Sequence, residues 1–349
     1  MIKKLLLIAC VAPVITFAQI LQSDQFTTLT AGNIGTDITG AAAGQNNWFI
    51  FSNNGAAPTT STNAAASNFI ATATGNPSNG ISLVGPNGDK GARYMWKNGL
   101  PAAWASRTVG NNIIEVEVDI NTGALSTSRN NFGVYIFNEA GDRVLAGFSV
   151  RAATRELFLV AYSTPTGNPV GSYSYSLAAA PGIQLAQNAW SRIGFSFNTV
   201  TGRALIKAPG IDPLGAYVDG SSPNTSPGEV DFVSFSGHTT TVANTSSTSM
   251  TFDNLVVRAS STDTLLGNED FTGKTLSAIL YPNPASDVLN IQSATDEITK
   301  ITITDLNGRI VKEVTSNLSQ ISLENIAKGI YMVTLESDTA KKIEKLIIE

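Results

Sequence analysis

Residues 113–120 read IIEVEVDI, and this alternation of apolar and acidic residues decides the fold class of the chain. Successive side chains of a β-strand point to opposite faces of a sheet. The apolar residues of this stretch therefore share one face, and Glu115, Glu117 and Asp119 share the other. No long segment between residues 19 and 260 follows the 3.6-residue period of a helix. We therefore expect an all-β protein.

Turn-forming residues connect further alternating runs into hairpins. Two such turns lie at 138–142 (NEAGD) and 198–202 (NTVTG), each between two runs of alternating side chains. Asn and Gly tolerate the positive φ angles that tight turns need. Residues 250–258 form one more alternating run. Short strands separated by regular turns predict a β-sandwich or a β-barrel.

The first 18 residues have the parts of a cleavable leader. Lys3 and Lys4 give a positive start, residues 5–15 form a short apolar run, and small residues precede a predicted cleavage site before Gln19. The only cysteine, Cys10, lies inside this leader, so the mature chain has no thiol for a disulfide. An alternative interpretation makes Cys10 the lipid anchor of a lipoprotein.

The mature chain is acidic. Removal of the two leader lysines reduces Lys plus Arg from 22 to 20 against 27 Asp plus Glu, which gives a net charge of −7. This balance argues against nucleic acid or an anionic membrane surface as a partner. No later run reaches the ~18 apolar residues of a membrane-spanning helix, so we expect no transmembrane segment in the mature chain.

The composition changes near residue 270. Between the leader and this point, nine of the twelve basic residues are Arg, whereas seven of the eight after it are Lys. All four tryptophans and the single His238 precede the change. We expect one domain over 19–260, a polar linker over 261–275 and a second domain over 276–349.

Four landmarks follow one another near the C-terminus. They are Tyr281-Pro282-Asn283-Pro284, Asp305-Leu306-Asn307-Gly308-Arg309, Lys328-Gly329-Ile330-Tyr331 and Lys345-Leu346-Ile347-Ile348. The prolines fix an extended entry, and the Asn-Gly pair is a strong hairpin signal. The alternating runs around the landmarks predict a small, immunoglobulin-like antiparallel β-sandwich. In this order and spacing, the landmarks resemble the type A sorting domain of the bacterial type IX secretion system over about residues 276–349.

The resemblance implies export across the outer membrane. The leader would deliver the chain to the periplasm, the type IX machinery would recognise the folded C-terminal domain, and a surface peptidase would remove it. The product would then be secreted or attached to the cell surface. An immunoglobulin-like spacer without an export role is the alternative.

The first domain resembles the concanavalin A-like, laminin G-like jelly rolls. Residues 189–197 (AWSRIGFSF), the following Thr201-Gly202-Arg203 turn and the closing residues 252–257 (FDNLVV) carry this likeness. It implies a jelly-roll β-sandwich. Many members of this class bind glycans or other proteins, some use calcium and some are glycoside hydrolases, so the fold alone does not choose a function.

The candidate ligand-binding residues combine aromatic rings with polar neighbours, a mixture that suits the apolar faces and hydroxyl groups of sugars. They are Arg93, Tyr94, Trp96, Trp104 and Arg107. We expect the domain to bind extracellular polysaccharide or glycoprotein, and a non-enzymatic adhesin or matrix protein is the alternative. Tyr94 and Trp96 share one face of their strand, so packing in the core is the competing explanation.

Glycoside hydrolysis is a second alternative, and it would use Glu115, Glu117 and Asp119. Retaining hydrolysis needs two carboxyl groups about 5 to 5.5 Å apart on the floor of a cleft. The array resembles the acid cluster of laminarinase-like jelly rolls but differs from it in order and spacing. An ordinary polar outer face explains the three acids more simply.

No cofactor is evident in the sequence, and a metal site stays unassigned. His238 has no partner at the ligand spacing of zinc. A calcium site is possible, because four aspartates could contribute oxygen ligands to it. They are Asp212, Asp219, Asp231 and Asp253, and they form no recognised calcium loop.

Deletion of residues 281–349 tests the export hypothesis. The shortened chain should accumulate in the periplasm, because it lacks the domain that the outer-membrane machinery would recognise. Immunoblots of periplasmic and extracellular fractions, with the full-length chain as control, measure this. Normal appearance of the shortened chain outside the cell would contradict the hypothesis.

Overall fold

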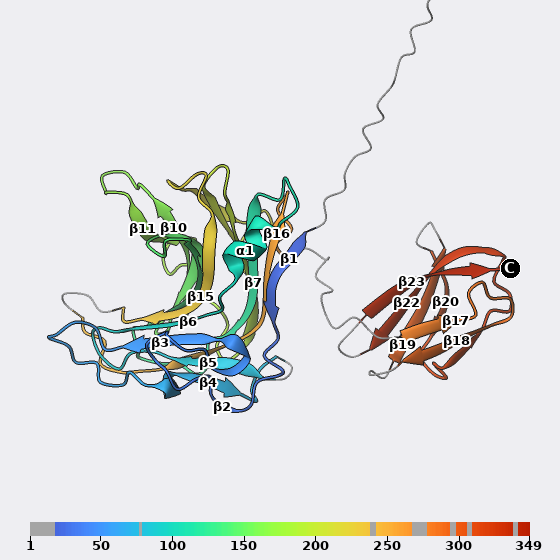
Figure 1. Ribbon diagram of the computed structural model, residues 1–349, viewed down its shortest axis with the longest axis horizontal. Coiled ribbons are helices and arrows are strands. Elements are labelled where there is room, and N and C mark those ends of the chain that lie inside the picture. The colour runs from blue at the N-terminus through green and yellow to red at the C-terminus, as the bar shows by residue number, and fades with distance from the viewer. Residues whose placement is uncertain are drawn as a thin grey trace, which may run out of the picture. The chain divides into compact units, whose positions relative to one another are not determined.

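The computed structural model describes residues 18–76, 79–237, 242–266, 278–293, 298–305, 309–337 and 341–349. Within these ranges the regular secondary structure is almost entirely antiparallel β, which confirms the predicted all-β class. It divides into two compact units between Leu266 and Gly267. We call them the central unit and the C-terminal unit (Figure 1).

One sheet of the central unit has nine strands. Eight of them lie in the order β14-β13-β12-β7-β16-β5-β4-β2, and β1 pairs with β16. Residues 113–120 belong to β7, in the middle of this sheet. The strands are β1 (Gln19–Asp24), β2 (Gly32–Asn33), β4 (Phe69–Thr72), β5 (Gly80–Val84), β7 (Ile113–Asn121), β12 (Trp190–Asn198), β13 (Arg203–Lys207), β14 (Ala216–Asp219) and β16 (Ser249–Ser260).

The other sheet of the central unit has seven strands in the order β11-β10-β9-β8-β15-β6-β3. They are β3 (Phe49–Asn53), β6 (Ala92–Trp96), β8 (Asn131–Asn138), β9 (Val144–Arg151), β10 (Glu156–Ser163), β11 (Gly171–Ser176) and β15 (Pro227–Phe235). The predicted hairpins are present as the pairs β8–β9 and β12–β13. Figure 1 shows the two sheets stacked as the layers of a sandwich, and the predicted jelly-roll β-sandwich is confirmed.

The main core lies between the two sheets, because each strand turns its apolar face inward. On β7, Val116, Val118 and Ile120 are fully buried. Phe232 of one sheet meets Phe252 of the other edge-on, with ring centroids 5.2 Å apart. Such aromatic contacts across the core hold the two layers together.

Short helices connect some of the strands. They are the 3-10 helices η1 (Gln45–Asn47) and η2 (Ala66–Asn68) and the α-helix α1 (Leu100–Ala105). Helix α1 contributes Leu100 and Trp104 to the core, where their exposed fractions are 0% and 3%. Over the described ranges, no helix combines the length and the apolar character that crossing a membrane requires.

The C-terminal unit consists of two small antiparallel sheets. Their strand orders are β17-β18-β21 and β20-β19-β22-β23. Ile301, Ile303, Val333 and Leu335 are buried in a core of their own, which confirms the predicted small sandwich. The strands are β17 (Ala278–Tyr281), β18 (Val288–Ser293), β19 (Ile298–Asp305), β20 (Ile310–Val314), β21 (Gln320–Ser322), β22 (Gly329–Ser337) and β23 (Lys341–Ile348).

Residues 263–266, which we call the strap, differ from the polar linker predicted over 261–275. The strap packs on the outer face of the nine-stranded sheet, where Leu265 is only 2% exposed. Gly194 of β12 makes room for it, since a Cβ at this position would lie 3.1 Å from the Leu265 side chain. The predicted linker residues 267–275 and the predicted leader residues 1–17, Cys10 included, lie outside the described residues.

Candidate functional site

The outer face of the seven-stranded sheet carries a cluster of aromatic side chains. On β6, Arg93 and Met95 point into the core, so the alternation of the strand turns Tyr94 and Trp96 outward. The same alternation on the neighbouring strands turns five more rings to this side. We call the cluster the aromatic face, and its members are Phe49, Phe51, Tyr94, Trp96, Tyr135, Phe137 and Phe235.

The rings of the aromatic face hold one another in place. Phe235 stacks on Tyr135 with ring centroids 6.0 Å apart and meets Tyr94 edge-on at 5.4 Å. Phe49 stacks on Trp96 at 5.8 Å. Each such pair contributes about 0.5–1.5 kcal/mol beyond the burial of its area. The rings are therefore fixed in position before any ligand arrives.

The aromatic face is only partly closed to solvent. Tyr135 lies flat on the sheet, and a Cβ at Gly147 would come within 2.5 Å of its ring, so only glycine fits beneath it. Val233 under the rings is fully buried. Phe137, Phe235 and the two outward residues of β6 are half-buried. They leave aromatic surface that a ligand can contact.

Two acidic residues of β15, Glu229 and Asp231, lie on the same outer face as the rings. In the sheet register Asp231 lies between Trp96 and Tyr135, and it is 2% exposed. Its Oδ1 has no hydrogen-bond partner among the described residues. Burial, and after it the charge of Glu229, raises the pKa of Asp231 well above its usual range. Burial also raises the pKa of Glu229.

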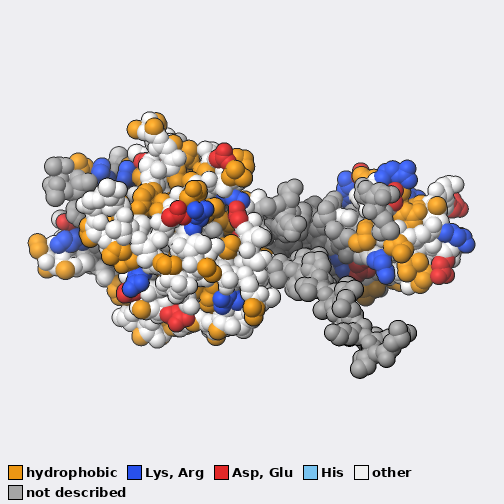
Figure 2. All heavy atoms as spheres, turned by 90° about the horizontal axis from the view of Figure 1, so that it is seen from above, with side chains coloured by type: hydrophobic (Ala, Val, Ile, Leu, Met, Phe, Trp, Pro, Cys, Tyr) orange, Lys and Arg blue, Asp and Glu red, His pale blue; other side chains and the backbone are white. Residues whose placement is uncertain are grey.

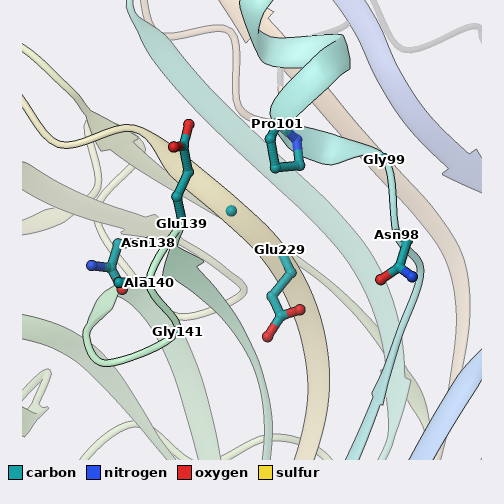
Figure 3. Close-up of a pocket in the computed structure, with 9 residues that line it drawn as sticks. Asn98, Gly99, Pro101, Asn138, Glu139, Ala140, Gly141 and Glu229 are labelled. Carbon is teal, nitrogen blue, oxygen red and sulfur yellow. The ribbon is translucent and has the colours of Figure 1, made fainter. Parts of the chain in front are cut away.

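A hollow of about 460 Å³ lies beside the aromatic face. Figure 3 shows Glu229 of β15 in its centre, the residues that lead into α1 on one side and the β8–β9 turn on the other. Trp96 connects the face to the hollow, because its Nε1 donates a hydrogen bond of 3.2 Å to Asn98 Oδ1. The lining residues are Asn98, Gly99, Pro101, Asn138, Glu139, Ala140, Gly141, Gly228 and Glu229.

The structure separates the five predicted ligand-binding residues. Tyr94 and Trp96 lie on the aromatic face. Arg93 is fully buried on the core side, where its NH1 donates to the backbone oxygen of Asn53. Trp104 is in the core, and Arg107 stacks on it at 4.1 Å and donates to its backbone oxygen at 3.0 Å. These three residues stabilise the end of α1 and the core, away from the aromatic face.

Residues 229–235 (EVDFVSF) form a part of the candidate site that the sequence analysis considered only through Asp231, as a possible calcium ligand. They alternate as regularly as residues 113–120, with Glu229, Asp231 and Phe235 on the outer face. This alternation could have been recognised in the sequence as the mark of a strand. Alternation alone, however, does not indicate which of the two sheets has an outer face that stays open to a ligand.

Glu115, Glu117 and Asp119 lie on the outer face of the other sheet, and we call them the carboxylate ladder. Their exposed fractions are 0%, 2% and 7%. Arg258 pairs with both glutamates, at 2.7 Å from its Nε to Glu115 Oε2 and with its NH2 on Glu117 Oε1. Arg192 lies 3.3 Å from Glu117 and from Asp119. The three acids lie on an outer face of the sandwich, as expected, but this face is not an ordinary polar one, because paired arginines bury the acids.

The strap covers the carboxylate ladder. Its backbone donates from Thr264 N to Glu115 Oε1 at 2.6 Å and from Leu266 N to Glu117 Oε1 at 2.8 Å. Thr264 Oγ1 also donates to Glu115 Oε2. Hydrolysis by these acids would need them on the floor of a cleft, whereas the structure encloses them under the strap and two guanidinium groups.

The aspartates considered for calcium lie on separate elements. Asp219 ends β14 and pairs with Arg203 at 2.7 Å, and Asp212 accepts a hydrogen bond from Leu214 N in a turn. Asp231 and Asp253 belong to β15 and β16, in different sheets. No three His, Cys, Asp or Glu side chains come together as a metal site within the described ranges. His238 lies outside them.

The landmarks of the C-terminal unit hold its strands together. Asn283 Nδ2 donates to Lys345 O at 2.6 Å, and its Oδ1 accepts from Ile347 N at 2.9 Å. This side chain therefore connects the Tyr281-Pro282-Asn283-Pro284 landmark to the closing strand. Tyr281 itself is 46% exposed beside it.

Two further landmarks are also explained by side-chain contacts. Asp305 accepts hydrogen bonds from Arg309 N at 2.9 Å and Arg309 Nε at 3.2 Å, across the predicted turn. Tyr331 donates from its hydroxyl to Ala327 O at 2.7 Å, next to Gly329. Gly308 lies outside the described residues.

Residues 279–349 match the protein family described as "Secretion system C-terminal sorting domain". This match confirms the resemblance stated for the C-terminal unit. The protein is exported by the type IX secretion system to the cell surface or to the outside of the cell.

Several solved structures are similar to the chain at low sequence identity. A marine PL-14 alginate lyase from Aplysia kurodai is 11% identical, with a TM-score of 0.42 over 67% of this chain and 99% of its own. The cellulose induced protein Cip1 is 13% identical, with a TM-score of 0.40 over 65% and 97%. The binding domain of botulinum neurotoxin DC is 9% identical, with a TM-score of 0.34 over 91% and 73%. These likenesses concern the fold alone, and no curated protein sequence matches the chain.

The substitution Glu115→Gln tests whether the carboxylate ladder is structural. Loss of one partner from a buried ion pair should lower the free energy of unfolding by about 3–5 kcal/mol. The matched control is Asp219→Asn, which breaks an exposed ion pair with Arg203. It should lower the free energy of unfolding by at most about 1 kcal/mol. Urea denaturation of the two variants measures the difference. Equal small losses would show that the buried pairs do not stabilise the fold.

Proposed function

We propose that the exported central unit is a non-catalytic module that binds extracellular polysaccharide or glycoprotein through its aromatic face. The observation that carries this proposal is the set of half-buried rings fixed beside a hollow with polar walls. Export places the module where such glycans are found. The proposal concerns the class of ligand, with the aromatic face as the contact surface.

The chemistry of sugars suits this surface. A pyranose ring has apolar C–H faces and a rim of hydroxyl groups, so it stacks on an aromatic ring while its hydroxyls find polar partners. Trp96 and Tyr94 supply aromatic surface, and the hollow next to them supplies carboxylate and amide oxygens from Glu229 and Asn98. A carboxylate accepts a strong, charge-assisted hydrogen bond from a hydroxyl.

The arrangement favours binding over hydrolysis. The three acids on β7 are enclosed by arginines and by the strap. On the open side, Asp231 is almost fully buried beneath the rings, so a glycosidic oxygen has no direct path to it. Rings fixed in advance, by contrast, lower the entropic cost of binding.

Adhesion is the second candidate role. It differs from the first only in that the processed protein stays attached to the cell surface. A module that stays on the cell surface and binds glycans would attach the cell to a glycan-bearing surface. The exported location favours this role without choosing between a released and an attached product.

The substitution Trp96→Ala tests the proposal directly. Loss of this ring should weaken binding to the glycan that the wild-type protein recognises by tenfold or more, about 1.4 kcal/mol, as is typical of an aromatic anchor. A glycan array identifies the ligand, and calorimetry measures the affinity. Thermal unfolding of the same variant shows whether the fold is intact.

Tyr217→Ala is the matched control. Tyr217 is also aromatic and 55% exposed, but it belongs to β14 in the other sheet, where it stacks with Arg203 at 3.9 Å. This variant should bind as the wild type does. Unchanged binding by Trp96→Ala, or equal losses in both variants, would argue against the aromatic face as the binding surface.

A further inference from the structure

We infer that the hollow beside the aromatic face selects neutral glycans and rejects chains of acidic sugars such as uronates. This inference rests on the proposed function and names the ligand class of the same site. It follows from the charges that line the hollow and from the positions of the nearest cations.

The hollow has an acidic lining. Glu139, in the β8–β9 turn, and Glu229, on β15, contribute carboxylates (Figure 3). The other described lining residues are uncharged, and no Lys or Arg is among them. An anionic sugar that enters this hollow would meet two like charges and no counter-charge. Repulsion between like charges at a partly dehydrated site strongly weakens the binding of such an anionic sugar.

The cations closest to the hollow in sequence are already engaged. Lys97 precedes the lining residue Asn98, but its Nζ lies 2.7 Å from Asp24 and 4.9 Å from the ring centroid of Trp48. Arg143 follows the β8–β9 turn, but its guanidinium lies 5.3 Å above the ring of Tyr162. Neither side chain is among those that line the hollow.

A third acid in this region also has no cation beside it among the side chains that line the hollow. Asp231 lies two residues along β15 from Glu229 and on the same face, with Oδ1 unpartnered among the described residues. The pKa of Asp231 is raised by burial first and by Glu229 second, as expected where no cation compensates the two acids. An acidic polymer finds no local partner for its carboxylates here.

The visible surface of the central unit agrees with this interpretation. On the face of the central unit in view, Figure 2 shows far more neutral than charged side chains, and the basic ones form no continuous stripe. Proteins that hold polyanions concentrate their basic side chains along the path of the polymer. A neutral glycan needs no such path, because stacking and hydrogen bonds to its hydroxyls are sufficient.

Matched pairs of hexasaccharides test the inference. Each pair has the same sugar and linkage and differs only at C6, as a neutral hydroxymethyl group or a carboxylate. The wild-type protein should bind the neutral member at least tenfold more tightly by calorimetry. The double variant E139Q/E229Q should reduce this ratio at least threefold, because the uronate gains affinity when the like charges are removed.

Two controls separate charge from fold. Asp219→Asn removes an exposed carboxylate of the other sheet and should leave the ratio unchanged. Thermal unfolding should show that E139Q/E229Q folds as the wild type does, since Gln has nearly the shape of Glu. Added salt should also reduce the wild-type ratio of the affinities for the neutral and the acidic hexasaccharide, because it screens the repulsion between the uronate and the two glutamates.

The outcomes for the two proposals are distinguishable. Equal or tighter binding of the uronates by the wild-type protein, or an unchanged ratio in E139Q/E229Q, would overturn the charge selection while the effect of Trp96→Ala still supports glycan binding. Absence of binding to every glycan would overturn both the selection and the proposed function.

Discussion

The buried ion pairs of Arg258 with Glu115 and Glu117 are the constraint on which the central unit depends. Burial of a charged group is costly unless the group is paired and hydrogen-bonded, and here one guanidinium and the strap backbone provide partners for both carboxylates. The pairing joins β7 to β16 and to the strap that follows β16, both of which lie far from β7 in the sequence. It closes the outer face of the nine-stranded sheet over the carboxylate ladder, and the other sheet provides the aromatic face.

The open surface follows from the same alternation that builds the core. Each strand of the seven-stranded sheet turns one set of side chains to the partner sheet and the other set outward. On β6 and β15 the outward set is aromatic and acidic, so the face combines rings such as Tyr94 with the carboxylate of Glu229. A hollow at the end of this face gives a ligand a place where it is contacted from several sides.

Much of the architecture could be predicted from the sequence, because alternation and turn residues act locally. The hairpin at 138–142 and the all-β class followed from such patterns, whereas the jelly roll and the sorting domain were expected from resemblance to known families. The site could not be predicted in the same way, because alternation separates two faces without saying which one is covered. Arg93 therefore lies in the core although it is charged, and Glu115 is buried by a strap that begins 148 residues later, at Asp263.

The most direct test of this account is a map of the surface that a glycan covers. Nuclear magnetic resonance titration of the central unit with its best neutral oligosaccharide would follow the backbone amide signals. A glycan on the aromatic face should shift the signals of residues 94–98, 135–141 and 228–235 and leave those of residues 115–119 unchanged. Shifts centred on 115–119 instead would contradict it, because the ligand would then lie on the face that the arginines and the strap close.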